Sequence, residues 1–384
     1  MIFEFATSQR ILFGPGTLRQ AAPLARELGS RALVVTSGDS SRAAALLSAL
    51  DDQGLAHVIF PVTVEPTLAT VRQGVVQATT SRCDLVIGFG GGSALDSAKA
   101  IAALTANGGD PLDHLEVIGR GLPLAKPSLP SVAIPTTAGT GSEVTHNAVL
   151  VSPEHGVKAS LRGPTLLPRI AIVDPELTYA LPPDITASTG LDALTQLIEP
   201  LTSIRANPLT DALCRAGIGR VARSLRRACT TGKDAAARAD MAMASLFGGL
   251  ALANAGLGAA HGLAGPVGGM FPAPHGAVCA ALLPHVMNIN IAALRARRPQ
   301  SPVLARYAEV ARLLTGSECA PPEEAAVWVL ELIVELKIPR LGAYGLTSTH
   351  IPVLAERATA ASSTKANPIP LTLDELSEIL ARAL

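Results

Sequence analysis

The sequence predicts an α/β domain built on a Rossmann-like parallel sheet, residues 1–182, followed by an all-helical domain, residues 183–384. Up to about residue 182, short β-branched runs alternate with helical segments, a pattern typical of parallel strands joined by helical crossovers. Beyond Pro182 no strand pattern remains, and helical segments follow one another with glycine and proline between them. The length of 384 residues also exceeds what one hydrophobic core usually serves.

The first domain is expected to alternate buried strands with helices. The strands expected are Arg31–Ser37, His57–Val62, Asp84–Gly90 and, as the last of the series, Ser131–Thr137. The helices expected between them are Ser40–Gly54, Leu68–Thr80 and Ser93–Gly109. This order predicts parallel pairing, with ligands at the carboxyl ends of the strands.

In the second domain, Pro183, Asp184 and Thr186 resemble a helix start. Helices with the length and period of a bundle are expected at Asp211–Cys229, Asp234–Leu252, Pro322–Leu336 and Leu373–Leu384. A further pair is expected around His261 and His275, each of which is followed by glycine. There we expect Gly268, Gly269 and Pro272 to form the connection between two helices, because these residues interrupt an apolar run.

Composition excludes several classes of function. Apolar residues make up 48% of the chain and charged residues 16%, while 31 basic and 31 acidic side chains give no net charge. Such a balance argues against nucleic acid or a membrane surface as a partner and favours a small molecule. The five cysteines form no CxxC pair, and no signal peptide or long uninterrupted apolar run is present. We therefore expect reduced thiols, no membrane span and a cytoplasmic location.

Four side chains suggest a metal site in the helical domain. Asp192 and Gln196 lie four residues apart on a helical segment and hence share a face. The hairpin expected around His261 and His275 would point both imidazoles into one cavity. Carboxylate and imidazole together suit zinc or iron(II). The alternative is that each histidine is an ordinary, partly buried core residue.

A glycine loop suggests a phosphate site in the first domain. Gly90, Gly91, Gly92 and Ser93 follow an expected strand and open an expected helix. Glycine lets the backbone approach a phosphate, and a helix N-terminus offers free N–H groups. The spacing differs from the GxGxxG fingerprint because Ser93 takes the place of the third glycine, so a purely structural tight turn is the alternative.

Segments along nearly the whole chain, in the same order, resemble the iron-containing alcohol dehydrogenases. They are RILFGPGT (Arg10–Thr17), GFGGGSALDSAKA (Gly88–Ala100), IPTTAGTGSEVT (Ile134–Thr145), IVDPELT (Ile172–Thr178), GLDALTQLIEP (Gly190–Pro200), ANPLTDAL (Ala206–Leu213) and the two-histidine segment. The resemblance implies a dehydroquinate synthase-like architecture, with a nucleotide-binding domain before a helical metal domain. It further implies NAD or NADP, Fe²⁺ or Zn²⁺, a small alcohol or aldehyde substrate, and a homo-oligomer, expected to be a dimer. We expect the active site in the cleft between the domains, because ligands favour domain interfaces and the carboxyl ends of parallel strands.

The resemblance also assigns residues to the cofactor. It places Gly91, Gly92 and Ser93 on the pyrophosphate, and Asp96 in an architectural or nicotinamide-side position. The adenine, ribose and nicotinamide portions are assigned to Thr136, Thr137, Thr140, Lys158 and Thr178. Ser37 stands where NAD-preferring relatives carry an aspartate, and the missing acid favours acceptance of NADP unless Asp39 takes its role.

For the metal, the resemblance implies one aspartate and three histidines. Asp192, His261 and His275 match, while Gln196 occupies the fourth position and offers a weaker donor than imidazole. Gly265 stands where relatives carry a histidine for proton transfer, so no catalytic residue is assigned.

These departures leave three alternatives open. The first is a maleylacetate-reductase-like enzyme without a tightly bound metal, which would need a basic pocket from Arg205, Arg226 or Arg227. The second is a lyase or cyclase of the dehydroquinate synthase type, which would need more basic residues. The third is a catalytically silent nucleotide-binding relative.

Overall fold

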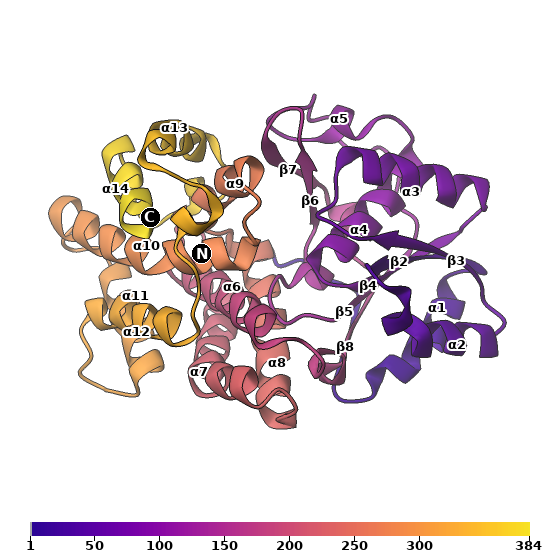
Figure 1. Cartoon of the computed structure of the whole chain (residues 1–384), viewed down its shortest axis with the longest axis horizontal. Coiled ribbons are helices and arrows are strands. Elements are labelled where there is room, and N and C mark those ends of the chain that lie inside the picture. Colours follow the sequence, from indigo (N-terminus) through magenta and orange to yellow (C-terminus); the bar gives the residue numbers. More distant parts are fainter. Residues whose placement is uncertain (1) are drawn as a thin grey trace. The chain divides into compact units, whose positions relative to one another are not determined.

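The computed structural model describes residues 2–384, which form two compact units (Figure 1). The α/β unit comprises Ala6–Thr137 and Gly141–Thr178, and the helical unit comprises residues 2–5, Ala138–Thr140 and Tyr179–Leu384. The short segment Ala138–Thr140 belongs to the helical unit because Ala138 lies in its core and Gly139 contacts Thr189.

A six-stranded sheet forms the centre of the α/β unit, in the order β1-β8-β5-β4-β2-β3, and all of its strands are parallel. The parallel sheet predicted from the alternation of strands and helices is thereby confirmed. Its strands are β1 (Arg10–Phe13), β2 (Arg31–Ser37), β3 (Ala56–Val62), β4 (Leu85–Gly90), β5 (Ser131–Pro135) and β8 (Ile170–Val173).

Helices cover both faces of this sheet, as Figure 1 shows. Side chains alternate along β2: Leu33 and Val35 pack with the helices α3 and α4, whereas Ala32 and Val34 pack with α1 and α2. Burial on both faces explains why the strands are continuous apolar runs. The helices of this unit are α1 (Ala21–Leu28), α2 (Ala44–Asp52), α3 (Leu68–Thr80), α4 (Gly92–Asn107) and the short α5 (Pro111–His114).

An antiparallel hairpin, β6 (Asn147–Ser152) and β7 (Val157–Arg162), adds to the face covered by α3 and α4. The expectation that Ser131–Thr137 is the last strand was wrong, because β6, β7 and β8 follow it. Each of these strands is only four to six residues long. In β6 alternate residues are buried, so it lacks the continuous apolar run that marked the central strands.

The helical unit contains no strand between Tyr179 and Leu384, which confirms the predicted all-helical region. Its first helix begins at Pro183, as expected from the sequence. The helices are α6 (Pro183–Thr202), α7 (Pro208–Thr230), α8 (Ala235–Ala255), α9 (Ala259–Met270), α10 (His275–Arg297), α11 (Val303–Thr315), α12 (Pro322–Glu335), α13 (Ile351–Ala360) and α14 (Leu373–Ala383).

Helix α10 lies at the centre of this unit and contributes to two hydrophobic clusters. Leu283 and Met287 pack with α6, α7, α11 and α12, whereas Leu282 and Val286 pack with α9, α13 and α14. By length and composition α10 would be able to cross a membrane, as would the bent pair α8 and α9. However, 83% of the most apolar part of α10 is buried within the fold, so packing accounts for its composition.

The connection between the two histidine-bearing helices lies later than expected. Helix α9 continues through Gly268 and Gly269 to Met270, and the connection is residues 271–274. A helical glycine costs only about 1 kcal/mol relative to alanine, which packing readily offsets. Pro272 and Pro274 end the helix instead, because a proline disfavours helical geometry in the residue before it.

Two glycines of α7 should respond oppositely to alanine. A Cβ at Gly217 would lie 2.5 Å from Leu197 Cδ2, whereas no described atom lies within 4 Å of a Cβ at Gly219. We expect Gly217→Ala to lower the free energy of unfolding by ~1–3 kcal/mol through overpacking. Gly219→Ala should raise it by ~0.5–1 kcal/mol because alanine restricts the unfolded chain. Urea unfolding checks both, and a similar effect of the two changes would contradict this packing.

Candidate metal centre and nucleotide loop

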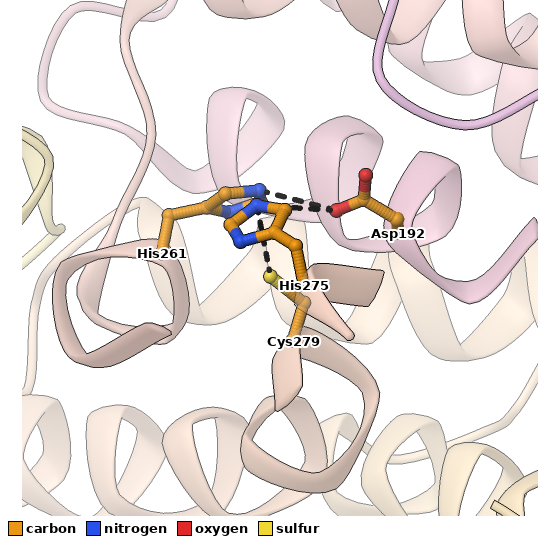
Figure 2. A group of neighbouring side chains, drawn as sticks. All are labelled: Asp192, His261, His275 and Cys279. Atoms are coloured by element: carbon orange, nitrogen blue, oxygen red, sulfur yellow. Dashed lines mark hydrogen bonds and ion pairs between the residues drawn. The ribbon is translucent and has the colours of Figure 1, made fainter. Parts of the chain in front are cut away.

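Four side chains of the helical unit converge from three helices (Figure 2). Asp192 comes from α6, His261 from α9, and His275 and Cys279 from α10. One ligand atom from each lies within 4.8 Å of the corresponding atoms of the others. Asp192 Oδ1 is 3.4 Å from His261 Nε2 and 3.9 Å from His275 Nε2. The structure thus brings together three of the residues that the sequence suggested for a metal, and adds Cys279.

The glycine after each histidine permits this convergence. A Cβ at Gly276 would lie 2.3 Å from the carbonyl oxygen of Ser188, so α10 approaches α6 closely only with glycine there. A Cβ at Gly262 would lie 2.0 Å from Thr364 Oγ1. Neither glycine has a positive φ. Close packing, rather than backbone conformation, therefore explains both His-Gly pairs.

Glu199 orients His261. His261 Nδ1 donates a hydrogen bond of 2.6 Å to Glu199 Oε2, and the backbone N–H of Ala260 donates one of 2.7 Å to Glu199 Oε1. When the ring is neutral, this bond places its proton on Nδ1, so that the lone pair of Nε2 faces Asp192. The sequence prediction did not include Glu199. The available signal was its spacing from Asp192 and Gln196, since positions i, i+4 and i+7 share a helix face.

Three buried atoms at the cluster make no hydrogen bond within residues 2–384: Asp192 Oδ1, Gln196 Oε1 and His261 Nε2. An unsatisfied buried polar atom costs about 1–3 kcal/mol, so natural sites rarely keep several together without a ligand. Burial alone would raise the pKa of Asp192, but the adjacent His261 and the charge of His275 hold it below its ordinary value. Asp192 is therefore a carboxylate at neutral pH, and the donor set fits a divalent metal.

Gln196 lies beside Asp192, as its spacing predicted, and its Nε2 donates a hydrogen bond of 3.2 Å to Asp192 Oδ2. At Gly265, by contrast, no described atom lies within 4 Å of the position a Cβ would take. A Cβ at this position would therefore meet no described neighbour, and Gly265 itself offers no group for proton transfer. Of the basic residues considered for an acidic substrate, Arg226 pairs with Glu335 and Arg227 with Asp234.

The glycine loop of the α/β unit lies where β2, β4 and β5 end. The backbone N–H of Gly91 donates a hydrogen bond of 3.0 Å to Ser37 Oγ, and the N–H of Thr136 donates one of 2.9 Å to the Gly90 carbonyl. A Cβ at Gly90 would lie 2.1 Å from Ser37 Oγ, and one at Gly91 would lie 3.4 Å from Thr137 Cγ2. Only glycine fits at position 90. Helix α4 begins at Gly92, so its first N–H groups have no partner within the helix.

Two of the other residues suggested for the cofactor, Lys158 and Thr178, have partners within the α/β unit. Lys158 pairs with Glu65 at 2.6 Å. Thr178 donates a hydrogen bond to the Pro175 carbonyl, and Thr140 belongs to the helical unit. Ser93, in the first turn of α4, is half-buried.

Asp96 belongs to a buried network of charges. It accepts hydrogen bonds from Ser142 Oγ and the Val149 N–H, and it pairs with Lys99 at 3.0 Å. The Lys99 ammonium also donates to the carbonyls of Ser142 and Asn147. This network joins α4 to the segment that follows the threonines. The sequence analysis missed Lys99, because nothing in a lone lysine of an alanine-rich helix indicates burial.

Glu143 lies buried near Lys99 and titrates in the neutral range. Burial raises the pKa of Glu143 to about 7, against the opposing effects of its own backbone N–H and the charge of Lys99. Burial also lowers the pKa of Lys99, against the pull of Asp96 and Glu143. The neutral form of Glu143 is thus favoured in the folded state below about pH 7.

Comparison with known proteins identifies the family. Residues 8–175 match the family described as iron-containing alcohol dehydrogenase, and residues 186–384 match its C-terminal family. The chain belongs to the iron-containing alcohol dehydrogenases. It is therefore an oxidoreductase of the alcohol dehydrogenase type, as predicted, and the family implies NAD(P) and a metal.

Individual relatives agree over their full length. The probable alcohol dehydrogenase EutG of Escherichia coli (strain K12) is 36% identical, over 99% of this chain and 94% of its own. The structure of a 1,3-propanediol oxidoreductase is similar with a TM-score of 0.92 at 32% identity, covering 100% of both chains. The sulfoacetaldehyde reductase of Bifidobacterium kashiwanohense in complex with NAD⁺ has a TM-score of 0.86 at 30% identity, covering 99% and 98%. These relatives favour alcohol and aldehyde chemistry over the maleylacetate-reductase-like alternative.

The buried Glu143 predicts a pH dependence of stability. Its folded pKa lies above the ordinary value of 4.5, so the folded state holds a proton that the unfolded state has lost between about pH 4.5 and 7. Stability contributed by this group is therefore lost as the pH rises through that range. Because glutamine does not titrate, Glu143→Gln should gain stability relative to wild type by up to ~1.4 kcal/mol per pH unit there. Urea unfolding from pH 5 to 8 measures this, and a constant difference would disprove the assignment.

Proposed function

We propose that this chain interconverts small primary alcohols and aldehydes, using NAD or NADP bound by the α/β unit and a Zn²⁺ or Fe²⁺ ion held in the helical unit. The observation that carries the proposal is the set of unsatisfied buried atoms, Asp192 Oδ1 and His261 Nε2 among them, beside His275. A carboxylate and two imidazoles converging in a buried site suit these ions. Relatives named for 1,3-propanediol and sulfoacetaldehyde support a small substrate.

The metal residues proposed are Asp192, His261 and His275, together with the side chain at the fourth position, where Gln196 stands. A divalent ion there would act as a Lewis acid and polarise the substrate oxygen. Neighbouring side chains of the chain itself hold these ligands in position. Glu199 fixes the ring of His261, and Gln196 holds one oxygen of Asp192 while the other stays available. Burial keeps bulk water from Asp192 and His261, which are 2% and 8% exposed.

For the nucleotide, we propose that Gly91, Gly92 and Ser93 receive the pyrophosphate at the N-terminus of α4, where the helix dipole and the N–H groups of the first turn favour an anion. Gly90 supports this proposal. A side chain there would collide with Ser37, so no side chain covers the backbone beside the loop. The remaining cofactor residues keep the roles that the family resemblance implies. They are Ser37, Asp96, Thr136, Thr137, Thr140, Lys158 and Thr178.

Three further proposals follow from the family and the sequence. The functional domains are residues 1–182 for the nucleotide and 183–384 for metal and substrate. The protein is a cytoplasmic enzyme, in keeping with five free cysteines. It assembles as a homodimer.

Ser37 should influence the choice of cofactor. Because no carboxylate stands at this position to bind the ribose hydroxyls and repel a 2′-phosphate, wild type should use NADP at least comparably with NAD. Ser37→Asp should shift the ratio of kcat/KM toward NAD by roughly tenfold or more, about 1.4 kcal/mol. Ser37→Ala is the control, since it removes the hydrogen bond to Gly91 without adding charge. Strong rejection of NADP by wild type would assign the role to another group, such as Asp39.

Glu199 should control metal affinity and thereby activity. Glu199→Gln leaves the volume unchanged but weakens the bond that orients His261, so metal affinity should fall roughly 10–100-fold. Competition with a chelator measures that affinity, and alcohol oxidation is followed by NAD(P)H absorbance. Asp192→Asn should remove metal and activity together. Undiminished turnover by metal-free wild type would contradict a metal-assisted reaction, and nucleotide binding without turnover of any small alcohol would indicate a silent relative.

A further inference from the structure

Cys279 has no role in the ligand set that the family resemblance implies, yet it lies inside the cluster. It follows His275 by one turn of α10, and its Sγ is 3.6 Å from His275 Nε2 (Figure 2). The thiol is completely buried. Its sulfur also lies within 4.8 Å of the ligand atoms of Asp192 and His261. Both of those atoms are buried without a hydrogen-bond partner within residues 2–384.

Two of the separations among these atoms match the edges of a tetrahedral metal site. Zinc bonds of about 2.0–2.1 Å to nitrogen or oxygen and about 2.3 Å to sulfur place neighbouring N and O atoms about 3.4 Å apart, and N and S atoms about 3.6 Å apart. His261 Nε2 and Asp192 Oδ1 are 3.4 Å apart, and His275 Nε2 and Cys279 Sγ are 3.6 Å apart. His275 Nε2 and Asp192 Oδ1, at 3.9 Å, are slightly wider.

The amide of Gln196 is oriented to hold Asp192 rather than to bind a metal. Its nitrogen, not its oxygen, faces the carboxylate of Asp192, at 3.2 Å from Oδ2. Its oxygen lies toward α8, 3.4 Å from the position that a Cβ at Gly248 would take. An amide N–H donor cannot bind a cation. Gln196 therefore suits the role of a positioning residue that holds Oδ2 while Oδ1 faces the histidines.

We propose that the thiolate of Cys279 is the fourth metal ligand, in place of Gln196, and that the site consequently selects zinc over iron(II). The inference rests on the proposed metal-dependent function and specifies its site. Metal binding forms one metal–sulfur bond and releases the thiol proton to solvent. A thiolate among imidazoles and a carboxylate favours a softer ion than an all-nitrogen and oxygen set does. The number of protein ligands stays the same as with one aspartate and three histidines.

Cobalt(II) provides a test that does not depend on activity. Chelator-treated protein is titrated with Co²⁺, whose bond to a thiolate gives a charge-transfer absorption in the near ultraviolet. Wild type should develop this absorption and lose it when Zn²⁺ is added. Cys279→Ser should abolish it and weaken Zn²⁺ binding roughly tenfold or more. Cys319→Ser, at an exposed cysteine, is the matched control and should leave the absorption unchanged.

Variants at Gln196 separate the two candidate ligands. Gln196→Ala should keep the cobalt–thiolate absorption, and the double variant Cys279→Ser with Gln196→His should regain Zn²⁺ affinity without it. Zinc X-ray absorption of wild type needs no variant and should show one sulfur neighbour at about 2.3 Å. Bound zinc without a sulfur neighbour would overturn this inference and leave the proposed function standing. A wild-type protein that binds neither Co²⁺ nor Zn²⁺ would overturn both.

Discussion

The buried carboxylate of Glu199 is the interaction on which the metal cluster depends. It accepts from His261 and from the Ala260 N–H, and so joins the last turns of α6 to the first turn of α9. A Cβ at Gly258 would lie 2.8 Å from the same carboxylate, so only glycine fits at this position, directly before α9. Asn367 Oδ1 accepts a hydrogen bond from the preceding N–H, that of Ala259, and another from Asn290 of α10. Because every member is buried, this network sets the imidazole in one orientation.

A buried charge has a comparable role in the α/β unit. The ammonium of Lys99 binds Asp96 and the carbonyls of Ser142 and Asn147, and so fixes the segment between β5 and β6 against α4. Removing a charge from water is expensive, and this arrangement persists because several oxygen atoms surround the ammonium. In each unit, a buried charged side chain that is not itself assigned to a ligand thus fixes the backbone near candidate site residues. Side chains of a site keep a precise geometry only when surrounding residues hold them in position.

Much of the fold followed from the local pattern of residues. Central strands such as β2 and β4 are buried on both faces and therefore appear in the sequence as continuous apolar runs. Helix α3 was predicted with its exact limits. The strands β1 and β8 have only four residues each and depend on pairing with neighbours distant in the sequence, whereas the strands of the hairpin β6–β7 lack a continuous apolar run. The turn predicted at Gly268 and Gly269 was wrong because packing in α9 offsets the low helix propensity of these two glycines.

The sequence by itself determined the alternation of strands and helices in the first domain, the all-helical second domain, the family, and the side chains able to bind metal or phosphate, because these depend on residue type and near spacing. Only the tertiary structure decided which of those side chains meet. In the sequence, Cys279 is one of five scattered cysteines and Glu199 is an ordinary helical acid. Their place at the metal cluster is visible only in the packing of α6, α9 and α10. Contacts between residues 60 or more positions apart depend on how helices pack, and packing is set by shape and burial across the whole unit rather than by any local pattern.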